Sequence, residues 1–161
     1  MIPWPISPSV FAYSFRHHLT RYNNASELTG TLTMQHLTPK QAHEFLRSNP
    51  EAVFIDVRSE IEHMFVGHPE GSLLIPWVDG PDWEINPDFV AHVKKAASVN
   101  RPVVLICRSG RRSVDAGMVL EQAGLTEVYN ILNGFEGDLN EHHHRNSING
   151  WRHEGLPWAQ T

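Results

Sequence analysis

The chain has 161 residues, which is enough for one domain with a full hydrophobic core. Its net charge of −5 argues against general nucleic-acid binding, and no apolar run approaches the roughly 20 residues that a membrane helix needs. A single cysteine excludes any disulfide within the chain, so nothing in the sequence depends on an oxidising compartment.

Residues 1–33 carry little structural signal. The prolines among the first eight residues disfavour both a helix and the apolar region of a secretion signal. Arg16 and Arg21 among serines and histidines faintly resemble an organelle transit peptide, but two arginines are few for one. We therefore expect a flexible extension at residues 1–33, a folded domain over residues 34–161 and a cytoplasmic protein.

Two helices and a strand are predicted in the first part of the domain. Thr38 as N-cap and Pro39 open the first helix, which ends at Asn49-Pro50. Residues 52–57 form an apolar run typical of a buried strand. Ser59 with Glu62 three residues later is a capping box, and it predicts a short helix closed by Gly67.

A second strand and an aromatic loop follow. Residues 73–75 are a short apolar strand, and residues 76–83 include Trp77 and Trp83. These tryptophans either form a wall of the functional site or pack in the core beneath the loop. Asn86-Pro87 predicts the start of another helix, with an apolar stripe that includes Phe89 and Val93.

The central stretch of the chain combines a strand, the single cysteine and a basic loop. Residues 103–106 read as a buried strand that stops at Cys107. Apolar residues at helical spacing then predict a helix that ends near Gly124. Between them lie the loop residues Arg108, Ser109, Gly110, Arg111, Arg112 and Ser113.

This loop suits a nucleophilic cysteine. Thiols attack as thiolates, and inward backbone N–H groups, a helix N-terminus and nearby guanidinium groups all favour the anion. Small Ser109 and Gly110 let the loop curl with its amides facing inward, and three arginines add positive charge. The alternative is that Cys107 is a small buried hydrophobic residue, but the basic loop after it is poorly explained that way.

The last third of the sequence predicts one more strand at residues 128–132 and a terminal helix over residues 150–158 anchored by aromatic side chains. The segment between them contains His142, His143 and His144, which raises the question of a metal site. Consecutive histidines on a loop rarely converge on one ion, so we expect neither a metal nor an organic cofactor.

Short apolar strands that alternate with helices predict an α/β fold, with a parallel sheet covered on both faces. The site is expected in the crevice beyond the carboxyl ends of the strands, where Cys107 lies. Arg58 ends a neighbouring strand and has two interpretations. It either contacts substrate anions beside Cys107 or forms a structural ion pair with Asp56 at the strand end.

Residues 107–113 resemble the active-site loop of the rhodanese-like sulfurtransferases. Further matches to that family lie at residues 54–58, Glu62, Gly67-His68, Gly124 and residues 128–134, and the resemblance covers about residues 36–158. It implies a three-layer fold around a five-stranded parallel sheet of order 1-5-4-2-3.

The resemblance also implies an activity and its partners. A Cys107 persulfide would carry sulfane sulfur from thiosulfate or a related persulfide donor to cyanide or a thiol, with Arg58 and residues 108–113 binding substrate. The partners would be these small molecules or, as the acceptor, a protein thiol; neither nucleic acid nor a membrane is expected as a partner.

Two other functions are weighed against this one. Cysteine phosphatases and arsenate reductases of the same fold resemble one another in a Cys-x5-Arg loop, whereas the sixth residue after Cys107 is Ser113. The shorter loop suits a sulfur atom better than a tetrahedral phosphate. Rhodanese-like domains also serve as non-catalytic interaction or sulfur-carrier modules, but such copies commonly lack the cysteine or the basic loop.

Overall fold

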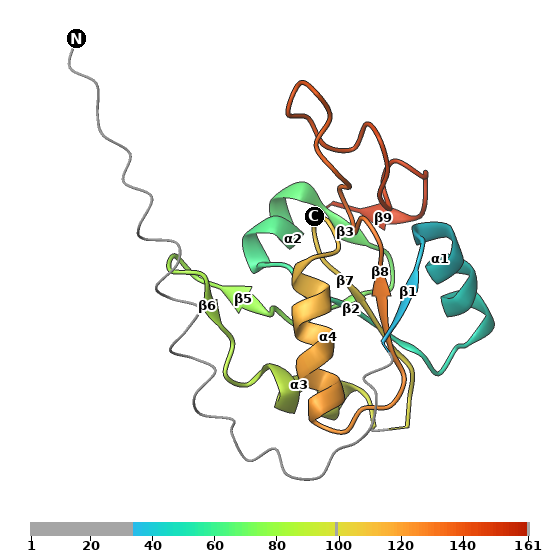
Figure 1. Cartoon of the computed structure of the whole chain (residues 1–161), viewed down its shortest axis with the longest axis vertical. Helices are drawn as coiled ribbons and strands as arrows, with labels where there is room; N and C mark the ends of the chain where they lie inside the picture. Colours follow the sequence, from blue (N-terminus) through green and yellow to red (C-terminus); the bar gives the residue numbers. More distant parts are fainter. Residues whose placement is uncertain (1–33, 99, 161) are drawn as a thin grey trace. The chain divides into compact units, whose positions relative to one another are not determined.

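A five-stranded parallel sheet forms the centre of the computed structural model, which describes residues 34–98 and 100–160 (Figure 1). Its strands are β1 (Gln35–Leu37), β2 (Val53–Asp56), β4 (Leu73–Leu74), β7 (Val103–Ile106) and β8 (Val128–Ile131). The order across the sheet is β1-β8-β7-β2-β4, and every pair is parallel. Numbered along the chain this is 1-5-4-2-3, so the predicted fold is confirmed; the predicted extension at residues 1–33 lies outside the described residues.

In the described part of the chain four helices accompany the strands: α1 (Pro39–Ser48), α2 (Glu60–Val66), α3 (Phe89–Ala96) and α4 (Arg112–Gln122). Thr38 caps α1 as predicted and forms a capping box with Gln41, and the predicted capping box of Ser59 with Glu62 opens α2. The helix expected after Asn86-Pro87 begins later, because Asn86 uses its side-chain oxygen to accept a hydrogen bond from the Asp88 N–H in a turn that precedes α3.

The strands of the sheet divide the core into two layers. Val103 and Leu105 of β7 pack in one buried cluster with side chains of α3 and α4. Val104 and Ile106 point the opposite way, into a second cluster that includes Ala42 of α1 and Trp151. This alternation follows from the two-residue period of a strand, and it explains why all four residues of β7 are buried.

The predicted C-terminal helix is wrong. Residues 150–157 form turns, and the strand β9 (Trp158–Ala159) then pairs antiparallel with β3 (His68–Pro69). Gly150 and Gly155 have φ values of 104° and 68°, outside the helical region, and Pro157 supplies no N–H to continue a helix. The expected aromatic anchor is real, since Trp151 is buried and its indole N–H donates to the Pro157 carbonyl.

A short hairpin was not anticipated. Strands β5 (Val78–Asp79) and β6 (Glu84–Ile85) pair antiparallel within the stretch predicted as an aromatic loop and its continuation.

Among the residues that the structure describes, no helix has the length and apolar character needed to cross a membrane.

Candidate active site

Cys107 stands at the centre of the carboxyl edge of the sheet. It follows β7, which lies between β2 and β8, and the helix α4 begins five residues later at Arg112. The predicted sequence of strand, loop and helix is therefore observed. Cys107 is 1 % exposed, and it packs against the apolar cluster beneath the sheet edge.

Two polar hydrogens point at the sulfur from the loop side. The backbone N–H of Gly110 donates to Sγ at 3.1 Å, and the Ser113 hydroxyl donates to Sγ at 3.2 Å. Ser113 is fully buried, so its hydroxyl is held in place. Cys107 is thus bounded by hydrocarbon on one side and by two hydrogen-bond donors on the other, and the donors are the groups suited to negative charge on sulfur.

The loop backbone needs glycine where it curls around the sulfur. Gly110 has a φ of 89°, and a Cβ there would lie 3.0 Å from the Asn133 N and 3.2 Å from the Ile131 carbonyl oxygen. A side chain would therefore be strained by both conformation and space. The sequence predicted that the loop amides face inward, and in the structure the Gly110 amide donates a hydrogen bond to Sγ.

A turn after β8 supports the loop from below, a role that the sequence did not reveal. The Phe135 N–H donates to the Cys107 carbonyl at 2.8 Å, and the Glu136 N–H donates to the Arg108 carbonyl at 2.9 Å. Gly134 precedes them with a φ of 58°, and a Cβ on it would clash with the backbone of Cys107. Gly134 was the sequence feature that could have indicated this turn.

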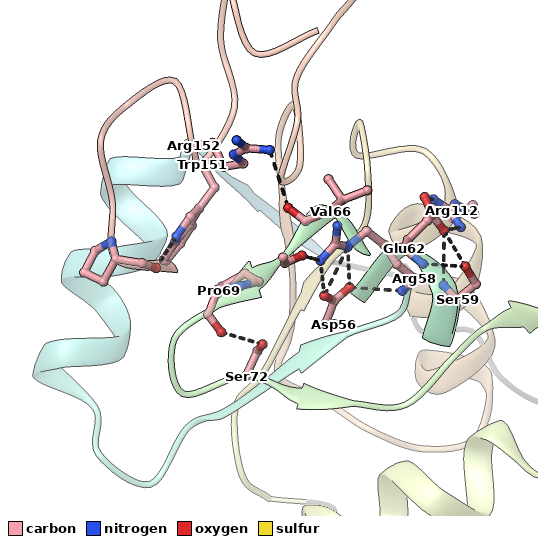
Figure 2. Close-up of polar contacts among 12 residues, drawn as sticks. Asp56, Arg58, Ser59, Glu62, Val66, Pro69, Ser72, Arg112, Trp151 and Arg152 are labelled. Atoms are coloured by element: carbon pink, nitrogen blue, oxygen red, sulfur yellow. Dashed lines mark hydrogen bonds and ion pairs between the residues drawn. The ribbon is translucent and has the colours of Figure 1, made fainter. Parts of the chain in front are cut away.

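The three loop arginines divide into two groups. Arg108 and Arg111 are exposed, whereas Arg112 forms a two-pronged ion pair with Glu62 of α2, at 2.7 and 2.6 Å (Figure 2). The guanidinium carbon of Arg112 also lies 5.3 Å from the ring centre of Trp83. Arg112 is therefore committed to holding the loop against α2, and the other two remain open to an anion.

The charges of this ion pair reinforce each other despite partial burial. Burial acts to lower the pKa of Arg112, but the hydrogen bonds and charge of Glu62, together with the charges of Cys107 and Asp56, raise it above the ordinary value. Burial likewise acts to raise the pKa of Glu62, but Arg112 and the hydrogen bonds from Ser59 bring it below its ordinary value. Both groups remain charged at neutral pH.

Arg58 has the structural surroundings of the second interpretation. Its guanidinium is fully buried, bonds the Asp56 carboxylate at 2.6 Å and donates to the Gly67 carbonyl at 2.7 Å (Figure 2). It also stacks over the Phe135 ring at 4.2 Å. Arg58 therefore makes the structural ion pair with Asp56 that the second interpretation predicted, and its contact with substrate stays a prediction.

The two loop tryptophans have different environments. Trp77 is buried at 7 % exposure and packs edge-on against Phe89, as the core interpretation predicted. Trp83 is 54 % exposed and lies beside Arg112 at the margin of the basic loop. Within residues 34–98 and 100–160, no three His, Cys, Asp or Glu side chains are grouped to hold a metal ion.

Comparison with known proteins agrees with this geometry. A family model described as "Rhodanese-like domain" matches residues 38–141, more than half of the chain. The uncharacterized protein RC0915 of Rickettsia conorii is 30 % identical over 135 residues, which cover 79 % of this chain and 98 % of that protein. The thiosulfate sulfurtransferase GlpE of Stutzerimonas stutzeri is 35 % identical over 101 residues, 62 % of this chain and 80 % of GlpE.

Solved structures show the same similarity. The crystal structure of Rv0390 from M. tuberculosis is 42 % identical, with a TM-score of 0.72 over 79 % of this chain and 98 % of that one. The polysulfide-sulfur transferase homodimer of Wolinella succinogenes is 25 % identical, with a TM-score of 0.57 over 80 % of each chain. The chain belongs to the rhodanese-like domain family, and its single cysteine lies at the carboxyl edge of the sheet, where it accepts a hydrogen bond from the loop that follows it.

Proposed function

We propose that the protein is a sulfurtransferase that moves sulfane sulfur from thiosulfate or a related donor to cyanide or a thiol through a persulfide on Cys107. One observation carries the proposal: Sγ of Cys107 accepts hydrogen bonds from the Gly110 N–H and the Ser113 hydroxyl at the end of the central strand. The similarity to a thiosulfate sulfurtransferase, at 35 % identity, supports the choice of donor.

In the first half-reaction the Cys107 thiolate attacks the outer sulfur of thiosulfate. A new S–S bond forms to Sγ, the S–S bond of thiosulfate breaks, and sulfite leaves with that electron pair. One thiolate and one thiosulfate dianion become one persulfide anion and one sulfite dianion, so charge and electrons balance. A preformed thiolate already holds the attacking pair, and no general base is needed.

In the second half-reaction the acceptor removes the outer sulfur. Cyanide attacks it, the persulfide S–S bond breaks, and thiocyanate leaves while the electron pair returns to Sγ. The donors from Gly110 and Ser113 face the negative sulfur before and after transfer, so they stabilise charge throughout the cycle. Arg108 and Arg111, exposed on the same loop, supply positive charge to the incoming dianion.

The near-complete burial of Cys107 favours small donors. At 1 % exposure, its sulfur is approached through the loop rather than from open solvent. The chain offers no second cysteine to resolve the persulfide, so sulfur leaves to an outside acceptor. A lone reactive thiol of this kind is suited to a reducing compartment, and we propose the cytoplasm as its location. The mechanism calls for no metal and no organic cofactor.

Mass spectrometry under non-reducing conditions tests the proposal. After incubation with thiosulfate we expect the mass of the chain to rise by one sulfur atom, located on Cys107, and to return to its starting value when cyanide is added and thiocyanate appears. Cys107→Ser should show neither change. Ser147→Ala, which alters an exposed serine outside residues 107–113, serves as the matched variant and should still be loaded.

Failure to load sulfur from thiosulfate, polysulfide or glutathione persulfide would instead indicate a non-catalytic module. Hydrolysis of a phosphate ester would indicate a phosphatase. At the position where those enzymes carry arginine, this chain has Ser113, whose hydroxyl donates a hydrogen bond to Sγ of Cys107.

A further inference from the structure

The short helix α2 has its apolar side turned toward solvent. Ile61, Met64 and Phe65 are 68 %, 44 % and 69 % exposed, and their spacing of three and four residues places them on one side of the helix. The neighbouring positions Glu62 and His63 turn toward the protein instead, where Glu62 binds Arg112 and the His63 ring stacks on His68. A surface helix ordinarily shows the reverse pattern, and a contiguous exposed apolar group of this kind marks an interaction site. We call these three side chains the α2 apolar face.

The helix that carries the α2 apolar face contacts the active-site loop. Glu62 on the inner side of the helix binds Arg112 at the start of α4, and Figure 1 shows α2 alongside that end of α4. Trp83, from the β5–β6 hairpin, is also exposed and lies beside Arg112. The exposed Trp83 and the helix with the α2 apolar face therefore both contact Arg112 at the loop from which sulfur would be delivered.

Two free positive charges accompany these apolar groups. Arg108 and Arg111 are exposed and make no ion pair with any residue in the described part of the chain, in contrast to Arg112. A small inorganic anion would use these arginines but would leave the α2 apolar face in water. A second copy of the chain would bring its own Arg108 and Arg111 to the same surface, where like charges repel.

We propose that the α2 apolar face is the docking surface for a protein sulfur acceptor, whose accepting cysteine is flanked by apolar and acidic residues. The apolar residues would cover Ile61, Met64 and Phe65, and the acidic residues would pair with Arg108 and Arg111. The inference rests on the proposed sulfurtransferase activity and names the acceptor class for it. The acceptor thiolate attacks the outer sulfur of the Cys107 persulfide, a persulfide forms on the acceptor, and the electron pair of the broken S–S bond remains on Sγ.

Peptide thiols of defined sequence test the proposal on the full chain. Three synthetic peptides carry one central cysteine, flanked by leucine, phenylalanine and glutamate in the first, by leucine, phenylalanine and lysine in the second, and by serine and glutamate in the third. The rate of sulfur transfer from the loaded protein is measured for each peptide and for cyanide. We expect the first peptide to react about tenfold faster than either of the others.

Substitutions then locate the effect. The double variant Ile61→Ser with Phe65→Ser should reduce the rate with the first peptide to that of the third, while the cyanide rate changes by less than about twofold. Ile148→Ser removes an isoleucine of similar exposure, 50 %, from another part of the chain and should leave every rate unchanged. Because these side chains are exposed, the variants should fold, which circular dichroism and thermal unfolding verify.

The outcomes separate this inference from the proposed function. If the persulfide forms and cyanide is consumed but the three peptides react alike, the docking proposal is overturned and the sulfurtransferase stands. If no persulfide forms, docking is judged by fluorescence anisotropy of the first peptide with serine in place of cysteine. Saturable binding of this peptide, weakened in the double variant, would support the docking proposal. Absence of binding would overturn the docking proposal. A dimer that the double variant dissociates, seen by light scattering, would overturn it in favour of a second copy.

Discussion

Replacing Glu62 by glutamine tests whether the ion pair with Arg112 holds the active-site loop. The two side chains form two hydrogen bonds of 2.7 and 2.6 Å, and they are 13 % and 18 % exposed. Glu62→Gln keeps the length of the side chain and an oxygen for the capping box but removes the negative charge. Arg112 would then remain largely buried without a counter-ion.

The expected cost lies between the limits for buried and exposed pairs. Removing one partner of a fully buried pair costs about 3–5 kcal/mol, and an exposed pair contributes about 0–1 kcal/mol. Both side chains of this pair keep some exposure, and glutamine can still accept one hydrogen bond from Arg112. We therefore expect the free energy of unfolding to fall by about 1–3 kcal/mol at neutral pH.

The loss should also depend on pH, with a defined sign. The pKa of Glu62 lies below its ordinary value of 4.5 in the folded protein, because Arg112 and Ser59 outweigh the effect of burial. A carboxyl of this kind stabilises the fold above its unfolded pKa, and the stabilisation is lost as pH falls through the folded pKa. The stability difference between wild type and Glu62→Gln should be constant above about pH 5.5 and should close at more acidic pH.

Urea unfolding followed by tryptophan fluorescence measures this difference at several pH values. Glu60→Gln is the matched control, because Glu60 lies in the same first turn of α2 but is exposed. We expect it to change the free energy of unfolding by no more than about 0.5 kcal/mol. The reasoning fails if the two variants lose equal stability, or if the Glu62→Gln difference is as large at acidic pH as at neutral pH.

Three further changes probe the sulfur environment and its support. Gly110→Ala should lower kcat/KM for thiosulfate at least about tenfold, because it displaces the amide that donates a hydrogen bond to Sγ. Gly124→Ala is the control, since Gly124 has a φ of 94° but open space around it. It should cost about 1 kcal/mol of stability and leave activity unchanged. Ser113→Ala should slow iodoacetamide alkylation of Cys107 at fixed pH by about 2–6-fold. The lost hydrogen bond contributes about 1–2 kcal/mol to the thiolate, and about half of this is regained because a less stabilised thiolate is the stronger nucleophile. An unchanged alkylation rate would show that the hydroxyl does not act on the sulfur. Arg58→Met should lower the free energy of unfolding by about 3–5 kcal/mol in urea titrations, and a raised KM for thiosulfate at unchanged stability would instead favour a substrate contact.

Local signals in the sequence were sufficient for the α/β class, whereas the order of the sheet came from the family resemblance. The apolar run ending at Cys107 and the capping residues Thr38 and Ser59 located a strand and two helix starts to within a residue or so, because strand burial and helix capping depend on neighbours in the chain. The prediction of a helix in the C-terminal segment failed because the structure there depends on a partner far away in the chain. Trp158 pairs with Pro69, a partner that no local pattern identifies, and the glycines at 150 and 155 favoured turns over a helix.

The amino-acid sequence by itself determined the α/β class, the place of Cys107 at a strand end and the basic, small-residue character of the loop after it. Only the tertiary structure decided what each arginine does. Arg58 is buried against Asp56, Arg112 is held by a glutamate fifty positions away in the chain, and Arg108 and Arg111 are left exposed. The physical reason is that identical guanidinium groups differ in role through burial and the nearest carboxylate, and both are set by which distant segments the sheet brings together.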